Sequence, residues 1–348
     1  MLVTDFDFTL PDDLVAQEPP AGRGTSRLLV LDRRTGATVR TVIADLAAFL
    51  APGDLLVVND TRVFPARLLG RRVPSGGAVE CLLLARLDAE RWDALVHPGQ
   101  KLRPGERFAC EGAGGRLEGE VLARHTFGRR TIRLWSEDGR DVDDVVDAIG
   151  HVPLPPYIKR PDAPADRERY QTLFARARGS VAAPTAGLHF TPALVAALAA
   201  RGVEQVALTL HVGYGTFKPV RTEVVEEHVV DPERYEIPVA TAAAINRALE
   251  EGRRVVAVGT TTTRALETAA LQGGGRIAAG AGVSDLFIRP GFAFRVVGAL
   301  VTNFHLPRSS LLMLVCAFAG RERILAAYAE AVAHRFRFYS YGDAMLVV

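Results

Sequence analysis

The stretch "RVVAVGTTTTRALETAALQGG", residues 254–274, joins a short apolar run to a helical pattern through one glycine and four threonines. The run between Arg254 and Gly259 is valine and alanine, as expected for a strand that is buried on both faces. Apolar residues then recur at helical spacing until a run of glycines that begins at Gly273, which predicts a helix over residues 263–274. A strand, a loop and a helix in this order form one unit of an α/β sheet.

The same order recurs on both sides of this stretch. A helix is predicted over residues 191–202, because Thr191 and Pro192 give a start signal and Gly202 gives a stop signal. It leads into an alternating strand at residues 204–212. Further strands are predicted at residues 54–60 and 298–304, and further helices at residues 241–253 and 309–320. Repeated units of this kind predict an α/β domain with a partly parallel sheet.

Residues 63–150 have a different pattern, in which short strands are separated by turns rich in glycine and proline. The breakers "PSGG", "PGQKLRPG" and "EGAGG" follow one another at close intervals, without a helical period between them. This spacing predicts a small antiparallel barrel or sandwich. Because α/β units stand on both sides of it, we expect the segment to be an insertion into the α/β domain.

The composition is that of an ordinary globular enzyme. The chain has 348 residues, 48% hydrophobic and 24% charged, a length that suits two domains. Its three cysteines show no metal-binding spacing, which favours a reducing compartment and no zinc site. No signal peptide is visible, and the most apolar run, "LLMLVCAFAG", is too short to span a membrane. We therefore expect a cytoplasmic protein.

Basic residues cluster in three stretches, although the net charge is only +2. Residues 157–179 interleave lysine and arginine with aromatic residues, and shorter basic stretches lie at residues 65–73 and 125–135. Such clusters are either solvated surface with ion pairs or a contact region for nucleic acid. Composition alone leaves both interpretations open.

Four loops carry polar residues where strands end and helices begin, at residues 183–191, 211–221, 258–267 and 302–310. In α/β sheets, ligands bind at the carboxyl ends of strands and close to helix N-termini. A single threonine or histidine in such a loop is usually a cap or a structural residue. Four such loops together predict one polar cleft for a nucleotide-like ligand with hydroxyl groups and a carboxylate. Histidines in three of them suit proton transfer near neutral pH.

Several common signatures are absent from the sequence. It contains no G-x-x-x-x-G-K-[ST] phosphate loop, no H-E-x-x-H metal motif and no G-x-S-x-G nucleophile elbow. No strand opens into G-x-G-x-x-G, so a dinucleotide site of the Rossmann type is not expected.

Specific blocks run in order through nearly the whole chain, among them "FDFTLPDDLVAQEP", "GDLLVVNDTRVFPARL", "PLPPYIKR", "VAAPTAGLHFT", "LHVGYGTFKPV", "VVAVGTTTTRALE" and "LVTNFHLPRSSLLMLV". In these blocks the chain resembles the S-adenosylmethionine:tRNA ribosyltransferase-isomerase family of queuosine biosynthesis. The resemblance implies an α/β catalytic domain formed by residues 1–62 and 152–348. A β-barrel-like domain at residues 63–151 would interrupt it.

The resemblance also implies an enzyme that is both a transferase and an isomerase in tRNA modification. Members of the family move the ribosyl part of S-adenosylmethionine onto the 7-aminomethyl-7-deazaguanine base of the tRNA anticodon and isomerise it to an epoxycyclopentanediol. Adenine and methionine are released, and the product is epoxyqueuosine-tRNA. S-adenosylmethionine is consumed as the ribosyl donor, and no metal is required. We expect a monomer with no membrane association and no obligate protein partner.

This reaction needs a base for the C5′ proton beside the sulfonium, an acid near the departing adenine and a clamp for the methionine carboxylate. We predict His211 and His189 as the proton-transfer pair, with His305 as the alternative. Arg264 is the predicted clamp, because a guanidinium binds a carboxylate through two N–H groups. The predicted S-adenosylmethionine-binding residues are Thr185, Gly187, Gly213, Tyr214, Gly215, Thr216, Phe217, Gly259, Thr260, Thr261 and Arg264.

The predicted tRNA-binding residues lie in the first basic stretch. Their cationic groups would contact phosphates, and a tyrosine would stack on an unpaired base. These residues are Tyr157, Lys159, Arg160, Arg167, Arg169, Tyr170, Arg176 and Arg178.

The chain departs from the family pattern at three places. Gly298 stands where an aspartate is common, Val230 and Asp231 replace a Met-His pair, and Thr263 replaces a valine. These departures leave open a related enzyme with a different acceptor base. Two further alternatives are an RNA methyltransferase that uses S-adenosylmethionine, although its usual Gly-rich loop is absent, and an RNA-binding module without catalytic activity.

Overall fold

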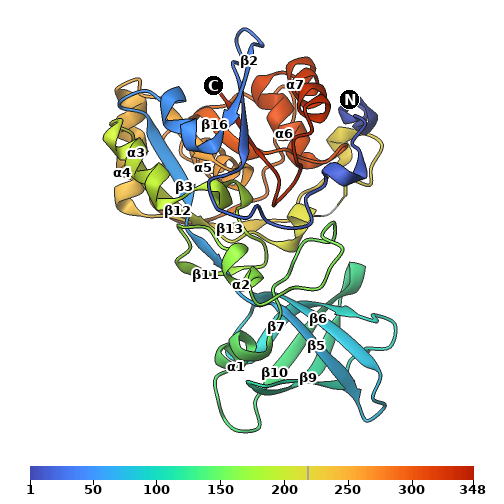
Figure 1. Ribbon diagram of the computed structural model, residues 1–348. Helices are drawn as coiled ribbons and strands as arrows, with labels where there is room; N and C mark the ends of the chain where they lie inside the picture. The colour runs from blue at the N-terminus through green and yellow to red at the C-terminus, as the bar shows by residue number, and fades with distance from the viewer. Residues whose placement is uncertain (218) are drawn as a thin grey trace.

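The computed structural model describes residues 1–217 and 219–348, and of Phe217 it describes the backbone alone. The chain forms an α/β body with a closed β-barrel below it, and both termini lie in the α/β body (Figure 1). The predicted fold class, an α/β domain combined with an antiparallel barrel, is confirmed.

The α/β body is built on a nine-stranded sheet in the order β15-β13-β12-β3-β14-β16-β17-β1-β2. The pairs β12–β3, β3–β14, β14–β16 and β1–β17 are parallel, and the other pairs are antiparallel, which confirms a partly parallel sheet. The strands are β1 Arg27–Leu31, β2 Thr38–Val42, β3 Leu55–Asn59, β12 Glu204–Leu210, β13 Glu233–Ile237, β14 Val255–Val258, β15 Gly280–Ser284, β16 Val297–Asn303 and β17 Ala344–Val347.

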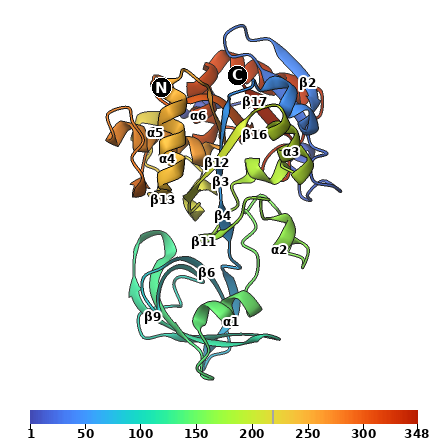
Figure 2. The ribbon, with the colours of Figure 1, turned by 90° about the vertical axis from the view of Figure 1, so that its left-hand side faces the viewer.

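Strand β3 lies in the centre of the sheet and is buried on both faces. Leu55 and Val57 belong to the hydrophobic core on one face, and Leu56 and Val58 belong to the core on the other. Helices cover both faces, with α3 and α5 on opposite sides of the sheet (Figure 2). A strand covered in this way needs apolar residues at every position, which explains the continuous apolar run in the sequence.

The longer helices all belong to the α/β body. They are α3 Pro192–Ala200, α4 Val239–Glu250, α5 Thr260–Gln272, α6 Ser310–Ala319 and α7 Arg321–Ala333. The predicted cap of α3 is confirmed, because Thr191 Oγ1 accepts a hydrogen bond from the N–H of Leu194 at 3.1 Å. Helix α5 begins at Thr260 rather than at residue 263, so the threonine run is its first turn and not a loop. Two of these threonines donate their hydroxyls to carbonyl groups four residues back, which satisfies them inside the helix.

The remaining helices are short. They are α1 Val142–Ile149, α2 Asp166–Arg169 and the 3₁₀ turns η1 Val3–Phe6, η2 Asp12–Leu14, η3 Ile43–Phe49, η4 Thr126–Gly128, η5 Thr185–His189, η6 Tyr214–Phe217 and η7 Val225–Glu227. Within the described chain, no helix combines the length and the apolar character needed to cross a membrane.

Six strands close into an antiparallel barrel in the order β10-β7-β6-β5-β8-β9. They are β5 Arg67–Val73, β6 Ala78–Arg86, β7 Arg91–His97, β8 Arg107–Gly112, β9 Gly115–Arg124 and β10 Arg129–Trp135. Buried residues such as Cys81, Phe108 and Val121 form a separate core here. Strands β4 (Thr61–Val63) and β11 (Ala177–Ser180) pair in parallel between barrel and α/β body (Figure 2). The exact domain boundaries, at residues 62/63 and 151/152, stay a prediction.

Glu267 anchors the start of β16 to helix α5. Its side chain is fully buried and accepts hydrogen bonds from the backbone N–H groups of Arg295, Val296 and Val297 at 2.8, 3.1 and 2.9 Å. A buried carboxylate is tolerated only when such donors replace its hydration. The hydrogen bonds therefore hold the strand that leads to the carboxyl edge of the sheet.

We expect Glu267→Gln to lower the free energy of unfolding by about 1–3 kcal/mol, because the amide turns an N–H group toward N–H donors. Urea unfolding measures this loss. The matched control is Glu250→Gln on α4, whose ion pair with Arg276 is exposed and whose loss should change stability by less than about 0.5 kcal/mol. Equal losses in the two variants would contradict the role given to Glu267.

Candidate active site

A cavity of about 310 Å³ lies at the carboxyl edge of the parallel strands in the α/β body. Its walls come from the four predicted loops, together with Tyr157, Tyr339 and Ser340. Because β12, β3, β14 and β16 are parallel, their carboxyl ends share one edge of the sheet and the loops that follow them converge there.

The structure separates the predicted S-adenosylmethionine-binding residues into two groups. Those that line the cavity are Thr185, Thr216, Gly259, Thr260 and Thr261. Those outside its lining are Gly187, Gly213, Tyr214, Gly215 and Arg264, while the side chain of Phe217 lies outside the described residues. Gly187 is used for packing, because a Cβ there would come within 2.9 Å of Thr172 Cγ2.

The first turn of α5 forms one wall of the cavity. Gly259 caps this helix with a φ of 94°, a left-handed conformation that glycine adopts without strain. Thr261 Oγ1 is buried and has no hydrogen-bond partner among the described residues. The N–H groups at a helix N-terminus attract anions, and a free hydroxyl adds another donor. This wall therefore suits a carboxylate.

Asn303 links the cavity to His189 behind it. Asn303 Nδ2 donates to His189 Nε2 at 3.1 Å, and Asn303 Oδ1 accepts from Thr185 Oγ1 at 3.1 Å. Since Nε2 accepts, Nδ1 carries the proton and donates it to Ser26 Oγ at 2.9 Å. Burial lowers the pKa of His189 to about 4, so its imidazole is neutral at pH 7. His189 is therefore placed to orient Asn303 rather than to contact a ligand in the cavity.

His305 is the member of the predicted histidine set that lines the cavity; His189 and His211, both within the described chain, do not. Its Nε2 lies 2.9 Å from Thr302 Oγ1, and its backbone N–H donates to the phenol oxygen of Tyr328 at 3.0 Å. Burial lowers the pKa of His305 to about 3. The ring is thus a neutral imidazole, able to accept a proton, at the wall of the cavity.

His211 is not among the residues that line the cavity. Its Nδ1 lies 2.9 Å from Thr61 Oγ1, and its ring covers Gly179, where a Cβ would come within 2.7 Å of His211 Cε1. The next residue, Val212, lines the cavity instead, because successive side chains of an extended segment point to opposite sides. The structure therefore does not bring His211 and His189 together as a pair at the cavity. The catalytic roles of the histidines stay predictions.

Arg264, the predicted carboxylate clamp, is engaged inside the protein. Its Nη1 donates to Glu233 Oε2 at 2.6 Å, and its other N–H groups donate to main-chain carbonyls. Glu233 Oε1 in turn accepts from the backbone N–H of Gly213 at 2.9 Å. This buried pair fixes the loop that contains Gly213 to α5. Sequence reasoning missed Glu233, although its place on the buried face of the alternating strand "ERYEI" was a usable signal.

Tyr157 and Tyr170, two of the predicted tRNA contacts, have different surroundings. Tyr157 lines the cavity, its ring centroid lies 4.0 Å from that of Tyr339, and its hydroxyl contacts Ser340 Oγ. Tyr170 is fully buried, with its ring edge-on to Tyr341. The first ring therefore borders the cavity, whereas the second is enclosed by the protein.

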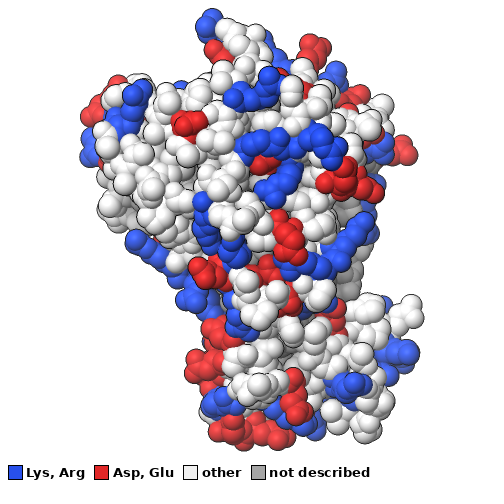
Figure 3. Space-filling model, in the orientation of Figure 1, with Lys and Arg blue, Asp and Glu red and all other residues white. Residues whose placement is uncertain are grey.

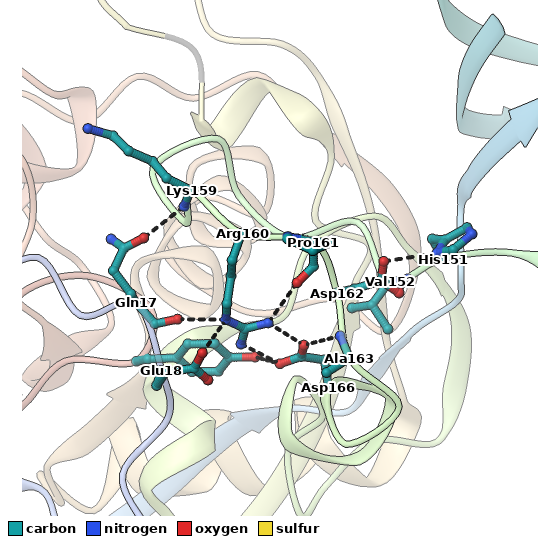
Figure 4. A network of polar contacts seen from close by, with 11 residues as sticks. Gln17, Glu18, His151, Val152, Lys159, Arg160, Pro161, Asp162, Ala163 and Asp166 are labelled. Carbon is teal, nitrogen blue, oxygen red and sulfur yellow. Dashed lines mark hydrogen bonds and ion pairs between the residues drawn. The ribbon is translucent and has the colours of Figure 1, made fainter. Parts of the chain in front are cut away.

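Two of the predicted tRNA-binding arginines are neutralised within the protein. Arg160 donates to both carboxylate oxygens of Asp166, at 2.7 and 2.9 Å, as Figure 4 shows. Arg178 pairs with Asp143 and Asp147 of α1, each at 2.8 Å. For these residues the interpretation as ion-paired surface is the better one.

The other predicted cations keep their charge available. Arg167 and Arg169 donate only to main-chain carbonyl groups of the described chain, which do not neutralise a guanidinium. Lys159 points its ammonium group away from the network of Arg160 (Figure 4), and the side chain of Arg176 is exposed. Acidic and basic side chains are interleaved over the face drawn in Figure 3, so the cations do not form one continuous basic surface there.

The departures from the family pattern lie outside the cavity lining. Gly298 is in β16, and a Cβ there would come within 2.8 Å of Arg254 Cγ. Val230 and Asp231 border a smaller pocket beside the Arg264–Glu233 pair. Among the described residues, no group of three or more His, Cys, Asp or Glu side chains is placed to hold a metal ion.

The buried neutral histidines predict a loss of stability in mild acid. In the unfolded chain a histidine binds a proton below about pH 6.5, whereas the folded pKa values are about 4 for His189 and about 3 for His305. The stability is therefore fully present above about pH 6.5 and falls as the pH drops from there toward the folded pKa values. Each histidine should lower the free energy of unfolding by up to about 1.4 kcal/mol for each unit by which the pH falls in this range.

Urea unfolding at several pH values between 7 and 5 measures this slope. The His189→Asn variant should lose stability less steeply with falling pH than the wild type does. His97→Asn, a change at an exposed histidine of the barrel, is the control and should keep the wild-type slope. A His189→Asn slope as steep as that of the wild type would rule out this explanation.

The whole chain matches known proteins of one family. A family profile described as "Queuosine biosynthesis protein" matches residues 3–347. Two proteins named S-adenosylmethionine:tRNA ribosyltransferase-isomerase are 50% identical (Heliobacterium modesticaldum, over 348 residues) and 55% identical (Anaeromyxobacter sp., over 350 residues). All of this chain is covered in both cases, with 100% and 99% of the respective relative.

A solved structure agrees with these relatives. The crystal structure of S-adenosylmethionine tRNA ribosyltransferase from Thermotoga maritima is similar with a TM-score of 0.55 and 38% sequence identity. The match covers 99% of this chain and 100% of that chain. The chain therefore belongs to the S-adenosylmethionine:tRNA ribosyltransferase-isomerase family of queuosine biosynthesis, a family of enzymes.

Proposed function

We propose that this enzyme acts in the cytoplasm, where it transfers the ribosyl part of S-adenosylmethionine to 7-aminomethyl-7-deazaguanine in the anticodon of tRNA and isomerises it. The products are epoxyqueuosine-tRNA, adenine and methionine. The observation that carries the proposal is the cavity at the carboxyl edge of the sheet, with its convergent polar loops. Its volume of about 310 Å³ suits a nucleoside-sized ligand.

The cavity offers a partner for each part of S-adenosylmethionine. The methionine carboxylate binds at the N-terminus of α5, where Thr261 Oγ1 is a further donor. The hydroxyls of Thr185 and Thr216 bind the ribose, and the apolar side chains of Val212 and Leu311 pack against adenine. Arg264 acts indirectly, by holding Glu233 and the loop that this carboxylate fixes.

His305 accepts the proton from C5′, a carbon acid activated by the adjacent sulfonium. Its pKa of about 3 keeps the imidazole in the basic form throughout the neutral range, and its contact with Thr302 fixes the ring. The same low pKa weakens the driving force for proton transfer. We therefore assign to His305 a contribution near the lower end of the usual range for general bases, about 10²-fold.

The acceptor base must leave its stack to reach the cavity, as in other enzymes that modify bases. Tyr157 and Tyr339 lie beside each other in the cavity wall, and their rings form a platform for an unpaired base. We assign them to the tRNA side of the site.

Product analysis tests the proposed reaction. Purified protein is incubated with S-adenosylmethionine and a tRNA that carries 7-aminomethyl-7-deazaguanine, and the nucleosides and free adenine are then identified by mass spectrometry. We expect adenine together with a nucleoside that bears the epoxycyclopentanediol. A methylated nucleoside without free adenine would instead identify a methyltransferase, and binding without any product would refute the proposed acceptor.

Two histidine variants test the assignment of the base. His305→Gln should lower kcat for adenine release about 10²-fold, because the proton acceptor is lost. His211→Ala, which changes a ring outside the cavity, should lower kcat by less than about tenfold. Calorimetry with S-adenosylmethionine checks that both variants keep a folded binding site. A larger loss of kcat in His211→Ala than in His305→Gln would overturn the assignment and favour His211 as the base.

A further inference from the structure

A notch that contains two arginines lies directly behind the cavity. Its lining includes Arg23, Arg169, His189 and Ser340. Ser340 also lines the cavity, and His189 reaches the cavity through its hydrogen bond with Asn303. The notch and the cavity therefore share a wall that is one residue thick at Ser340.

Each arginine presents a buried N–H group that has no acceptor among the described residues, at Nη1 of Arg23 and at Nε of Arg169. Other N–H groups of these side chains are used to fix them. Arg23 Nη2 donates to the carbonyl of Glu168 at 2.6 Å, and Arg169 donates to two carbonyls of the segment that precedes Arg23. Buried N–H groups without an acceptor are rare in folded proteins, and each one requires an explanation.

The charge of the notch points to the missing acceptor. Within the described chain, no carboxylate is hydrogen-bonded to Arg23 or Arg169. Asp166 is occupied by Arg160 and Tyr341, and Arg23 bonds Glu168 through its main-chain carbonyl alone. Burial lowers the pKa of Arg23, the positive charge of Arg169 lowers it further, and Glu168 offsets part of this effect. Two fixed guanidinium groups with free donors form a site for an anionic oxygen.

We propose that Arg23 and Arg169 bind a backbone phosphate of the tRNA, next to the nucleotide whose base enters the cavity. The notch has a volume of about 20 Å³, which admits roughly one oxygen atom and excludes a whole nucleotide. A phosphodiester fits, because its charged oxygen projects from the strand while the sugars stay outside. The inference rests on the proposed function, in which the RNA strand passes this wall and the methionine carboxylate is bound at α5.

Binding of tRNA at several salt concentrations tests the subsite. We expect Arg23→Gln to weaken tRNA binding about 3- to 10-fold and to reduce the slope of log K against log salt by about one. The affinity for S-adenosylmethionine, measured by calorimetry, should not change. Arg276→Gln, which removes an exposed arginine paired with Glu250, is the control and should leave the salt slope at its wild-type value.

A second measurement keeps the proposal testable if Arg23→Gln does not fold. In this measurement, chloride is replaced by inorganic phosphate at constant ionic strength, and the apparent Kd for tRNA is compared between the wild type and Arg169→Lys. The variant keeps the charge but loses the buried Nε–H group. The Kd of the wild type should therefore rise more than that of the variant. An unchanged salt slope in Arg23→Gln would overturn the proposal. So would a loss of S-adenosylmethionine affinity with intact tRNA binding, since the notch would then hold the methionine carboxylate.

The subsite and the reaction can fail separately. A wild-type protein that shows the expected salt slope but releases no adenine would refute the proposed reaction and leave the phosphate site standing. Adenine release with no effect of Arg23→Gln on RNA binding would refute the phosphate site and leave the proposed reaction standing.

Discussion

The parallel pairing of β3 with β12 on one side and with β14 on the other is the constraint on which the candidate active site depends. Val57 of β3 lies opposite Val206 and Ala257, so the three strands reach the carboxyl edge of the sheet side by side. A slip of one residue would exchange the residues that face the two buried cores, and both cores oppose such a slip. Packing far from the cavity thus sets the positions of the loops that line it.

Burial then decides the chemistry of the residues at that edge. His189 and His305 are kept neutral because a buried imidazolium would lose its hydration without gaining a carboxylate partner that bonds to it among the described residues. Arg264 and Glu233 form a buried ion pair in which each side chain satisfies the other. The titratable residues near the cavity therefore divide into a histidine that lines the cavity and residues that hold its walls in place. Arg23 and Arg169 fit neither group, which is why the notch stands apart from the packing network.

Features that depend on neighbouring residues could be predicted from the sequence. The strand–helix units and the cap of α3 follow from local patterns, and the spacing of turns in residues 63–150 indicated a barrel or a sandwich. The resemblance to a family then favoured the barrel. The start of α5 was missed because a run of β-branched threonines has a low helix propensity, whereas the structure lets their hydroxyls bond within the first turn.

Features that depend on distant residues could not be predicted in this way. An alternating strand separates His211 from Val212, but it does not tell which of them faces the cavity, because that depends on the loops of other strands. A basic stretch likewise does not reveal its partners. Arg178 pairs with Asp143, which is 35 positions away in α1, so the fold converts part of an apparent RNA-binding surface into ion pairs.

A crystal structure of the protein with S-adenosylmethionine, in the absence of tRNA, would test the central claim most directly. The account predicts the adenosyl group in the cavity, the methionine carboxylate at the first turn of α5 and C5′ facing the imidazole of His305. Ligand density beside His211 and Thr61, outside the cavity, or a carboxylate bound between Arg23 and Arg169, would contradict it.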